Sequence, residues 1–171
     1  MIIRPTEPRD RAALLSLAAA TGLFEPSQIG ELDELLNRYS SRTPRPHIAN
    51  SEFWLTVDVN GPIGVAYVAP ERMTDSVWNL YLIAIHPDYQ HQGYGTQLLH
   101  QVEHRLRQQE ERLLLVETSG TEDFEPVRAF YQRNGYAEAA KVRDFYAAGI
   151  DKVIFSKALE TPSDGVRGIV A

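Results

Sequence analysis

The chain has 171 residues, of which 43% are hydrophobic and 23% are charged, as is ordinary for a soluble globular protein. It contains no cysteine, which excludes disulfides, thiolate zinc sites and cysteine nucleophiles and favours a reducing, cytoplasmic setting. The formal net charge is −6, Lys and Arg form no dense cluster, and no apolar run approaches membrane-spanning length, so we expect neither nucleic acid nor a membrane as a partner.

Hydrophobic periodicity and turn residues predict elements in the order β-α-α-β-β-β-α-β-α-β-β. Thr6 or Asp10 is the expected N-cap of the first helix, and Pro26 suits the first position of the second. In chain order the predicted elements cover residues 2–4, a helix ending near 21, then 26–39, 53–59, 63–69, 77–86, a helix ending near 111, 113–118, 126–134, 136–146 and 152–158. Residues 40–50 are expected to form a loop.

This order predicts an α/β (α+β) fold with a single mixed, mostly antiparallel sheet of about seven strands and helices on both faces. Residues 77–86 are apolar at almost every position, which is expected of a central strand buried on both sides. We expect residues 1–160 to form one domain and residues 161–171 a flexible tail.

A glycine-containing turn between the central strand and the next helix is the most informative motif. Gly93 and Gly95 leave the backbone unobstructed there, so amide N–H groups and the helix N-terminus can converge on an anion. A classical dinucleotide-binding fold would place such a turn after its first strand, whereas here it follows the fourth. The turn therefore predicts a pyrophosphate site of another kind.

Two blocks of sequence resemble the GNAT acyltransferase superfamily. The spacing Gln90-x-x-Gly93-x-Gly95 is similar to that family's acetyl-CoA motif at the end of its fourth strand. About forty residues later, the family's FYxxxGF/Y segment is matched by Phe130-Tyr131-Gln132-Arg133-Asn134-Gly135-Tyr136. The resemblance covers the chain to about Leu159 and implies a GNAT-like fold that transfers an acetyl group from acetyl-CoA.

The resemblance also implies where CoA would bind. Backbone groups of Ile83, Ala84 and Ile85 would pair with the pantetheine arm, and one N–H there would polarise the thioester carbonyl. The pyrophosphate would be bound, chiefly by backbone N–H groups, at Gln90, His91, Gln92, Gly93, Tyr94, Gly95 and Thr96. The family often has Asn where this chain has Phe124, so that contact is either absent or supplied from elsewhere, such as Ser119 or Thr121.

Two residues are candidates for catalysis. Tyr131 occupies the position of the family's general acid, and an ordinary tyrosine pKa of about 10 suits protonation of the CoA thiolate. Its alternative role is structural, because Val127, Phe130 and Tyr131 lie on one helical face. Glu117 ends an apolar strand, where a buried carboxylate is a candidate general base for the amine; alternatively it reaches solvent or bonds its neighbours.

The acceptor site is expected beside the loop between the third and fourth strands. Glu71 and Asp75 in that loop, with Asn79 and Tyr81 on one face of the fourth strand, are the candidate substrate-binding residues for a cationic amine. The five histidines show no metal-ligand spacing, so we expect no metal.

The acceptor itself stays open at the level of sequence. We expect an N-acetyltransferase for a primary amine of a small molecule or peptide, using acetyl-CoA as co-substrate. The alternatives are a protein N-terminal or lysine acetyltransferase and a non-catalytic acetyl-CoA sensor. A cleft roofed by residues 40–50 would favour small amines and an open one peptides. A homodimer through the last strands is possible.

Overall fold

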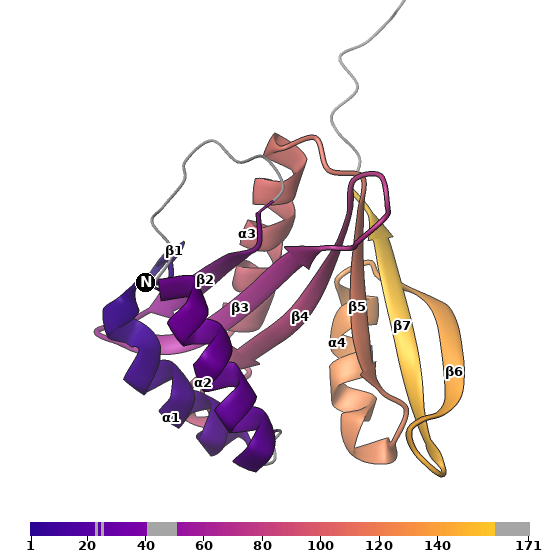
Figure 1. The fold of residues 1–171 in the computed structure, drawn as a ribbon, viewed down its shortest axis with the longest axis horizontal. Coiled ribbons are helices and arrows are strands. Elements are labelled where there is room, and N and C mark those ends of the chain that lie inside the picture. Colours follow the sequence, from indigo (N-terminus) through magenta and orange to yellow (C-terminus); the bar gives the residue numbers. More distant parts are fainter. Residues whose placement is uncertain (23, 25, 41–50, 160–171) are drawn as a thin grey trace, which may run out of the picture.

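A mixed sheet of seven strands is the centre of the computed structural model, which describes residues 1–22, 24, 26–40 and 51–159 (Figure 1). The strands are β1 (Ile2–Pro5), β2 (Phe53–Asp58), β3 (Pro62–Pro70), β4 (Val77–Ile85), β5 (Leu113–Ser119), β6 (Ala137–Ala147) and β7 (Ile150–Ala158). The helices are α1 (Arg11–Thr21), α2 (Pro26–Ser40), α3 (Tyr94–Gln108) and α4 (Glu125–Arg133), with short 3-10 helices η1 (Pro8–Asp10), η2 (Pro87–Tyr89) and η3 (Glu122–Phe124). The predicted fold class is confirmed.

The strand order is β1-β2-β3-β4-β5-β7-β6, and every neighbouring pair is antiparallel except β4 with β5. Helices α1 and α2 cover β2 to β4 on one face, where Leu14, Leu36 and Trp54 share a buried cluster. Helices α3 and α4 pack on the opposite face, where Leu98 and Tyr131 join the larger cluster. Among the described helices, none lies in front of β5, β7 and β6 in Figure 1, so this half of the front face is open.

Strand β4 separates from β5 halfway along its length. The parallel pairing runs from Val77 opposite Leu113 to Leu80 opposite Val116 and ends there, and the two strands diverge visibly below that point in Figure 1. Against β3, Val68 pairs with Leu80 and Tyr67 with Leu82, which leaves Tyr81 as an extra, bulged residue. Tyr81 is 54% exposed and Leu82 and Ile83 are partly exposed, so the expectation that β4 is buried throughout is wrong for these three residues, whereas Ala84 and Ile85 are buried again.

Of the two residues predicted to cap α1, Asp10 is the one at the N-cap, but its side chain makes no capping hydrogen bond. Its carboxylate instead accepts hydrogen bonds from Arg4 of β1 at 2.6 and 2.9 Å and from the Glu7 N–H at 2.9 Å. Burial alone would raise the pKa of Asp10, and these hydrogen bonds and the Arg4 charge lower it overall. Thr6 instead pairs with Thr56, hydroxyl to hydroxyl, at 2.7 Å. The predicted loop at 40–50 and the predicted tail fall almost entirely outside the described residues.

Candidate active site

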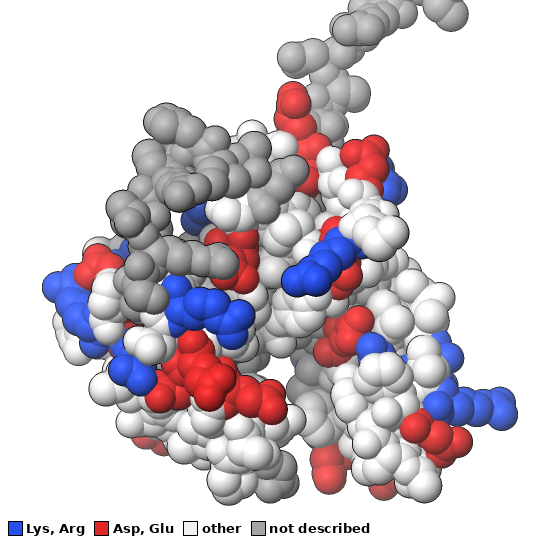
Figure 2. All heavy atoms as spheres, viewed as in Figure 1, with Lys and Arg blue, Asp and Glu red and all other residues white. Residues whose placement is uncertain are grey.

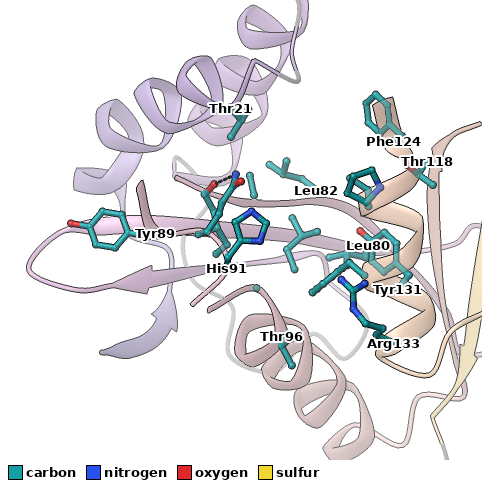
Figure 3. Close-up of a pocket in the computed structure, with 18 of the residues that line it drawn as sticks. Thr21, Leu80, Leu82, Tyr89, His91, Thr96, Thr118, Phe124, Tyr131 and Arg133 are labelled. Carbon is teal, nitrogen blue, oxygen red and sulfur yellow. Dashed lines mark hydrogen bonds between the residues drawn. The ribbon is translucent and has the colours of Figure 1, made fainter. Parts of the chain in front are cut away.

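A pocket of about 500 Å³ opens where β4 and β5 diverge (Figure 3). Its walls are the β4 residues 80–85, the end of β5 at Glu117 and Thr118, the glycine turn, and the N-terminal part and inner face of α4. Thr21 at the end of α1 and Phe24 after it complete the lining. The two sequence blocks that suggested a common site therefore do meet in one pocket.

The glycine turn delivers free backbone donors to this pocket. Gly93 is the N-cap of α3 with φ +85°, a left-handed conformation that glycine adopts without strain, and His91 has φ +59°. The first hydrogen bond of the helix runs from the Gln97 N–H to the Gly93 carbonyl at 3.0 Å. The N–H groups of Tyr94, Gly95 and Thr96 thus have no partner within the helix, and they add to the positive end of its dipole.

The side chains of the turn have mostly structural contacts. Gln90 donates to the carbonyl of Ile85 at 3.0 Å, tying the turn to the end of β4, and Gln92 donates to the carbonyl of Asp88 at 3.1 Å. Gly95 lies against Phe130 and Ile85, where an added Cβ would already be in van der Waals contact. His91 and Thr96 line the pocket. The geometry suits an anion bound by backbone more than by side chains.

The second half of β4 presents an open backbone edge to the same pocket. Ile83, Ala84 and Ile85 pair with β3 on one side, while the pairing with β5 has already ended on the other. All three line the pocket. An extended group in the cleft can therefore hydrogen-bond to β4 in the manner of an added strand.

Tyr131 projects from α4 toward β4 in Figure 3, beside Leu80. Its side chain is 4% exposed and packs against Phe130, Tyr136 and Phe155, with ring centroids 5.3–6.0 Å apart. Burial raises the pKa of Tyr131, so its hydroxyl is protonated at neutral pH. Tyr131 is thus part of the core and also lines the pocket.

Glu117 is not the desolvated carboxylate that its apolar strand suggested. It points to the open front face, its side chain is 33% exposed, and Lys152 of β7 forms an ion pair with it at 2.8 Å. Lys152 in turn lies 3.6 Å from the ring centre of Phe145. Glu117 is partly exposed because α1 and α2 cover only the first half of the sheet, and no pattern within β5 reveals where that cover ends.

Glu71, Asn79 and Tyr81 form one hydrogen-bonded group with Glu117. The Asn79 amide donates to Glu71 at 2.9 Å and to Glu117 at 3.4 Å, and the Tyr81 hydroxyl donates to Glu71 at 3.0 Å. Limited hydration of its hydroxyl and the hydrogen bond to Glu71 raise the pKa of Tyr81 to about 12. Asp75 does not join this group, because it is exposed and its carboxylate contacts only the adjacent Ser76 at 3.3 Å.

The structure adds residues to which the sequence assigned no role in the site. Arg133, within the Phe-Tyr block, lines the pocket, where its charge suits a phosphate. Phe124 also lines it, while Ser119 and Thr121 bond to each other at 3.1 Å. Lys152 could not have been placed from sequence, because its position depends on β7 pairing with β5 rather than only with β6. Within the described part of the chain, no group of three or more His, Asp or Glu side chains could hold a metal ion.

Charge on the front face is mixed. Figure 2 shows acidic side chains gathered over α2 and others over the open half of the sheet, with Lys and Arg among them. None of the described helices has both the length and the apolar character that crossing a membrane requires.

Comparisons with known proteins place this architecture in a family. The family described as Acetyltransferase (GNAT) domain matches residues 49–138. A protein from Desulfovibrio desulfuricans assigned to the GNAT acetyltransferase family is 30% identical, with a TM-score of 0.85, covering 93% of this chain and 99% of that one. The comparison with curated protein sequences gave no match.

More distant structures share the fold. The ribosomal-protein-S18-alanine N-acetyltransferase from Escherichia coli has a TM-score of 0.71 at 20% identity, covering 98% of this chain and 99% of its own. An aminoglycoside 6'-N-acetyltransferase complexed with coenzyme A has a TM-score of 0.71 at 14% identity, covering 94% and 98%. With the family match over more than half of its length, this chain belongs to the GNAT family of acetyltransferases and is an acyltransferase.

Proposed function

We propose that this protein transfers an acetyl group from acetyl-CoA directly to a primary amine of a small molecule or peptide. The observation that carries the proposal is the single pocket that combines the open edge of β4, the free N–H groups of α3 and the hydroxyl of Tyr131. Together these three features suit the phosphates and the thioester of one ligand.

The binding of the donor follows from the backbone geometry. The N–H groups of residues 94–96 hold the pyrophosphate at the positive end of α3, with Arg133 adding a positive charge. The pantetheine arm lies along the edge of β4 at residues 83–85. This brings the thioester to the point where β4 and β5 part, and a β4 N–H there polarises its carbonyl.

Transfer then needs three proton movements. The acceptor ammonium loses a proton to Glu117, directly or through water, and the free amine attacks the thioester carbonyl. The C–N bond forms as the C–S bond breaks, and Tyr131 gives its proton to the departing thiolate. The second proton on the attacking nitrogen then passes to the Tyr131 oxygen, directly or through water, which leaves a neutral amide and restores the hydroxyl. Much of the rate comes from holding the two reactants side by side in one cleft.

A thiol-release assay tests this function directly. Because the chain has no cysteine, a thiol reagent reports only the CoA set free. We expect acetyl-CoA-dependent release above background with at least one class among simple amines, amino acids, polyamines and peptides. Acetyl-CoA binding measured by calorimetry, together with no release for any class, would contradict the proposal and indicate a sensor.

A further inference from the structure

Two carboxylates on the front face share a single amide group. The Asn79 Nδ2 atom donates to Glu71 Oε1 at 2.9 Å and to Glu117 Oε1 at 3.4 Å. Asn79 is only 1% exposed, so the sheet fixes the amide and, through it, the position of both carboxylates. Glu71, directly after the end of β3, and Glu117 of β5 therefore lie close together, with the amide of Asn79 on β4 between them.

The two carboxylates differ in how their charge is balanced. Glu117 has the ammonium of Lys152 at 2.8 Å. Glu71 is half-buried and receives its hydrogen bonds from the neutral Asn79 amide and Tyr81 hydroxyl, and none of the described residues forms an ion pair with it. Tyr81 stays neutral at physiological pH because its pKa is raised, so the negative charge of Glu71 is not compensated by its neighbours.

One polar atom of this group has no hydrogen-bond partner in the described part of the chain. Asn79 Oδ1 is buried, and no hydrogen-bond donor among the described residues reaches it. Buried acceptors are normally paired, so an unpaired one beside an uncompensated carboxylate indicates a missing donor. The pocket already extends to Tyr81 and Glu117, the two residues that connect it to Glu71 and Asn79.

We infer that the acceptor carries two amino groups joined by a short aliphatic chain, and that Glu71 binds the one that does not react. The inference rests on the proposed function, because the reacting amine is the one that lies beside Glu117. The ring of Tyr81, whose hydroxyl contacts Glu71 and whose centre lies 5.8 Å from that of Tyr67, supplies an apolar surface for the connecting chain. Glu71 is thus a specificity-determining residue rather than a base.

The test compares diaminobutane with butylamine, which has the same chain without the second amino group. For the wild-type protein we expect kcat/KM to favour diaminobutane at least about tenfold, the size of one charge-assisted hydrogen bond. In Glu71→Gln this preference should fall below about threefold, because KM should rise more for diaminobutane than for butylamine. Tyr81→Phe, which keeps the carboxylate but removes one hydrogen bond that orients it, should give an intermediate preference.

A matched control and a second measurement keep the outcome decisive. Glu138→Gln changes an exposed carboxylate on β6 and should leave the preference as in the wild type. Equal losses for both amines in Glu71→Gln, or no wild-type preference for diaminobutane, would overturn the inference. If neither amine is turned over, calorimetry measures the binding of each amine to the CoA-bound protein. Tighter binding of diaminobutane than of butylamine, lost in Glu71→Gln, would support the inference. Equal binding of the two amines would overturn it.

Discussion

Tyr131 is the residue on which the proposed mechanism depends. Its ring packs against three aromatic neighbours in the core, and the residue also lines the pocket. Burial raises its pKa and so keeps the hydroxyl protonated at neutral pH, which is the state that a proton donor requires.

Burial of tyrosines also makes stability depend on alkaline pH. The pKa values of Tyr131 and Tyr136 are raised chiefly by burial, so above about pH 10 the unfolded chain releases protons that the folded protein keeps. The unfolded state then binds fewer protons, and the free energy of unfolding should fall as pH rises. Urea unfolding between pH 8 and 11 measures this slope. We expect a shallower slope in Tyr136→Phe, and an unchanged slope would contradict the account.

Sequence predicted some residues of the site and not others, for a physical reason. Tyr131 and the glycine turn belong to local patterns, so their placement needs no knowledge of distant contacts. Glu117 and Lys152 are neighbours only because β5 pairs with β7 and because no described helix covers that part of the front face. The residue pattern of a single strand does not show which strand pairs with it or which helix covers it.

At the scale of elements, α3 is tied to β7 and α4 through a buried carboxylate. Glu103 of α3 is 2% exposed and accepts hydrogen bonds from Lys157 at 2.9 Å, Arg107 at 3.0 Å and the Tyr136 hydroxyl at 3.0 Å. Lys157 also donates to the carbonyl of Asn134 at the C-terminal end of α4 at 2.8 Å. This junction fixes α3, whose N-terminus is the proposed phosphate site, relative to α4, which carries Tyr131.

Replacing Glu103 with Gln should therefore destabilise the fold without touching the pocket. Lys157 would lose its charge partner in a mostly buried position, at a cost of about 2–4 kcal/mol. Glu110→Gln, at an exposed site just beyond the same helix, should change stability by less than about 0.5 kcal/mol. Urea unfolding followed by Trp fluorescence measures both. Equal stability of the two variants would show that the junction contributes nothing.

The elements themselves were largely predictable, and their irregularities were not. Period-two and helical patterns gave the order of strands and helices, because each element buries one regular face. The bulge at Tyr81 reverses which side chains of β4 face α1 and α2, so Leu80 packs on one side of the sheet and Leu82 on the other. Because residues 77–86 are apolar at almost every position, their sequence does not show whether the strand contains such a bulge.

For the whole molecule, the parting of β4 and β5 creates the site. The one parallel pair in an otherwise antiparallel sheet divides it into a half covered by helices on both faces and a half whose front is open. The donor is expected to lie in the gap against α3 and α4, while the acceptor approaches from the open front where Glu71 and Glu117 lie. The donor and the acceptor are thus expected to enter the cleft from different sides.

The central claim is tested most directly by Tyr131→Phe, measured for acetyl-CoA affinity by calorimetry and for kcat by thiol release with an accepted amine. The account predicts unchanged affinity and a loss of about 10²–10⁴ in kcat, the usual contribution of a general acid. Equal turnover by Tyr131→Phe and the wild-type protein would remove Tyr131 from the mechanism.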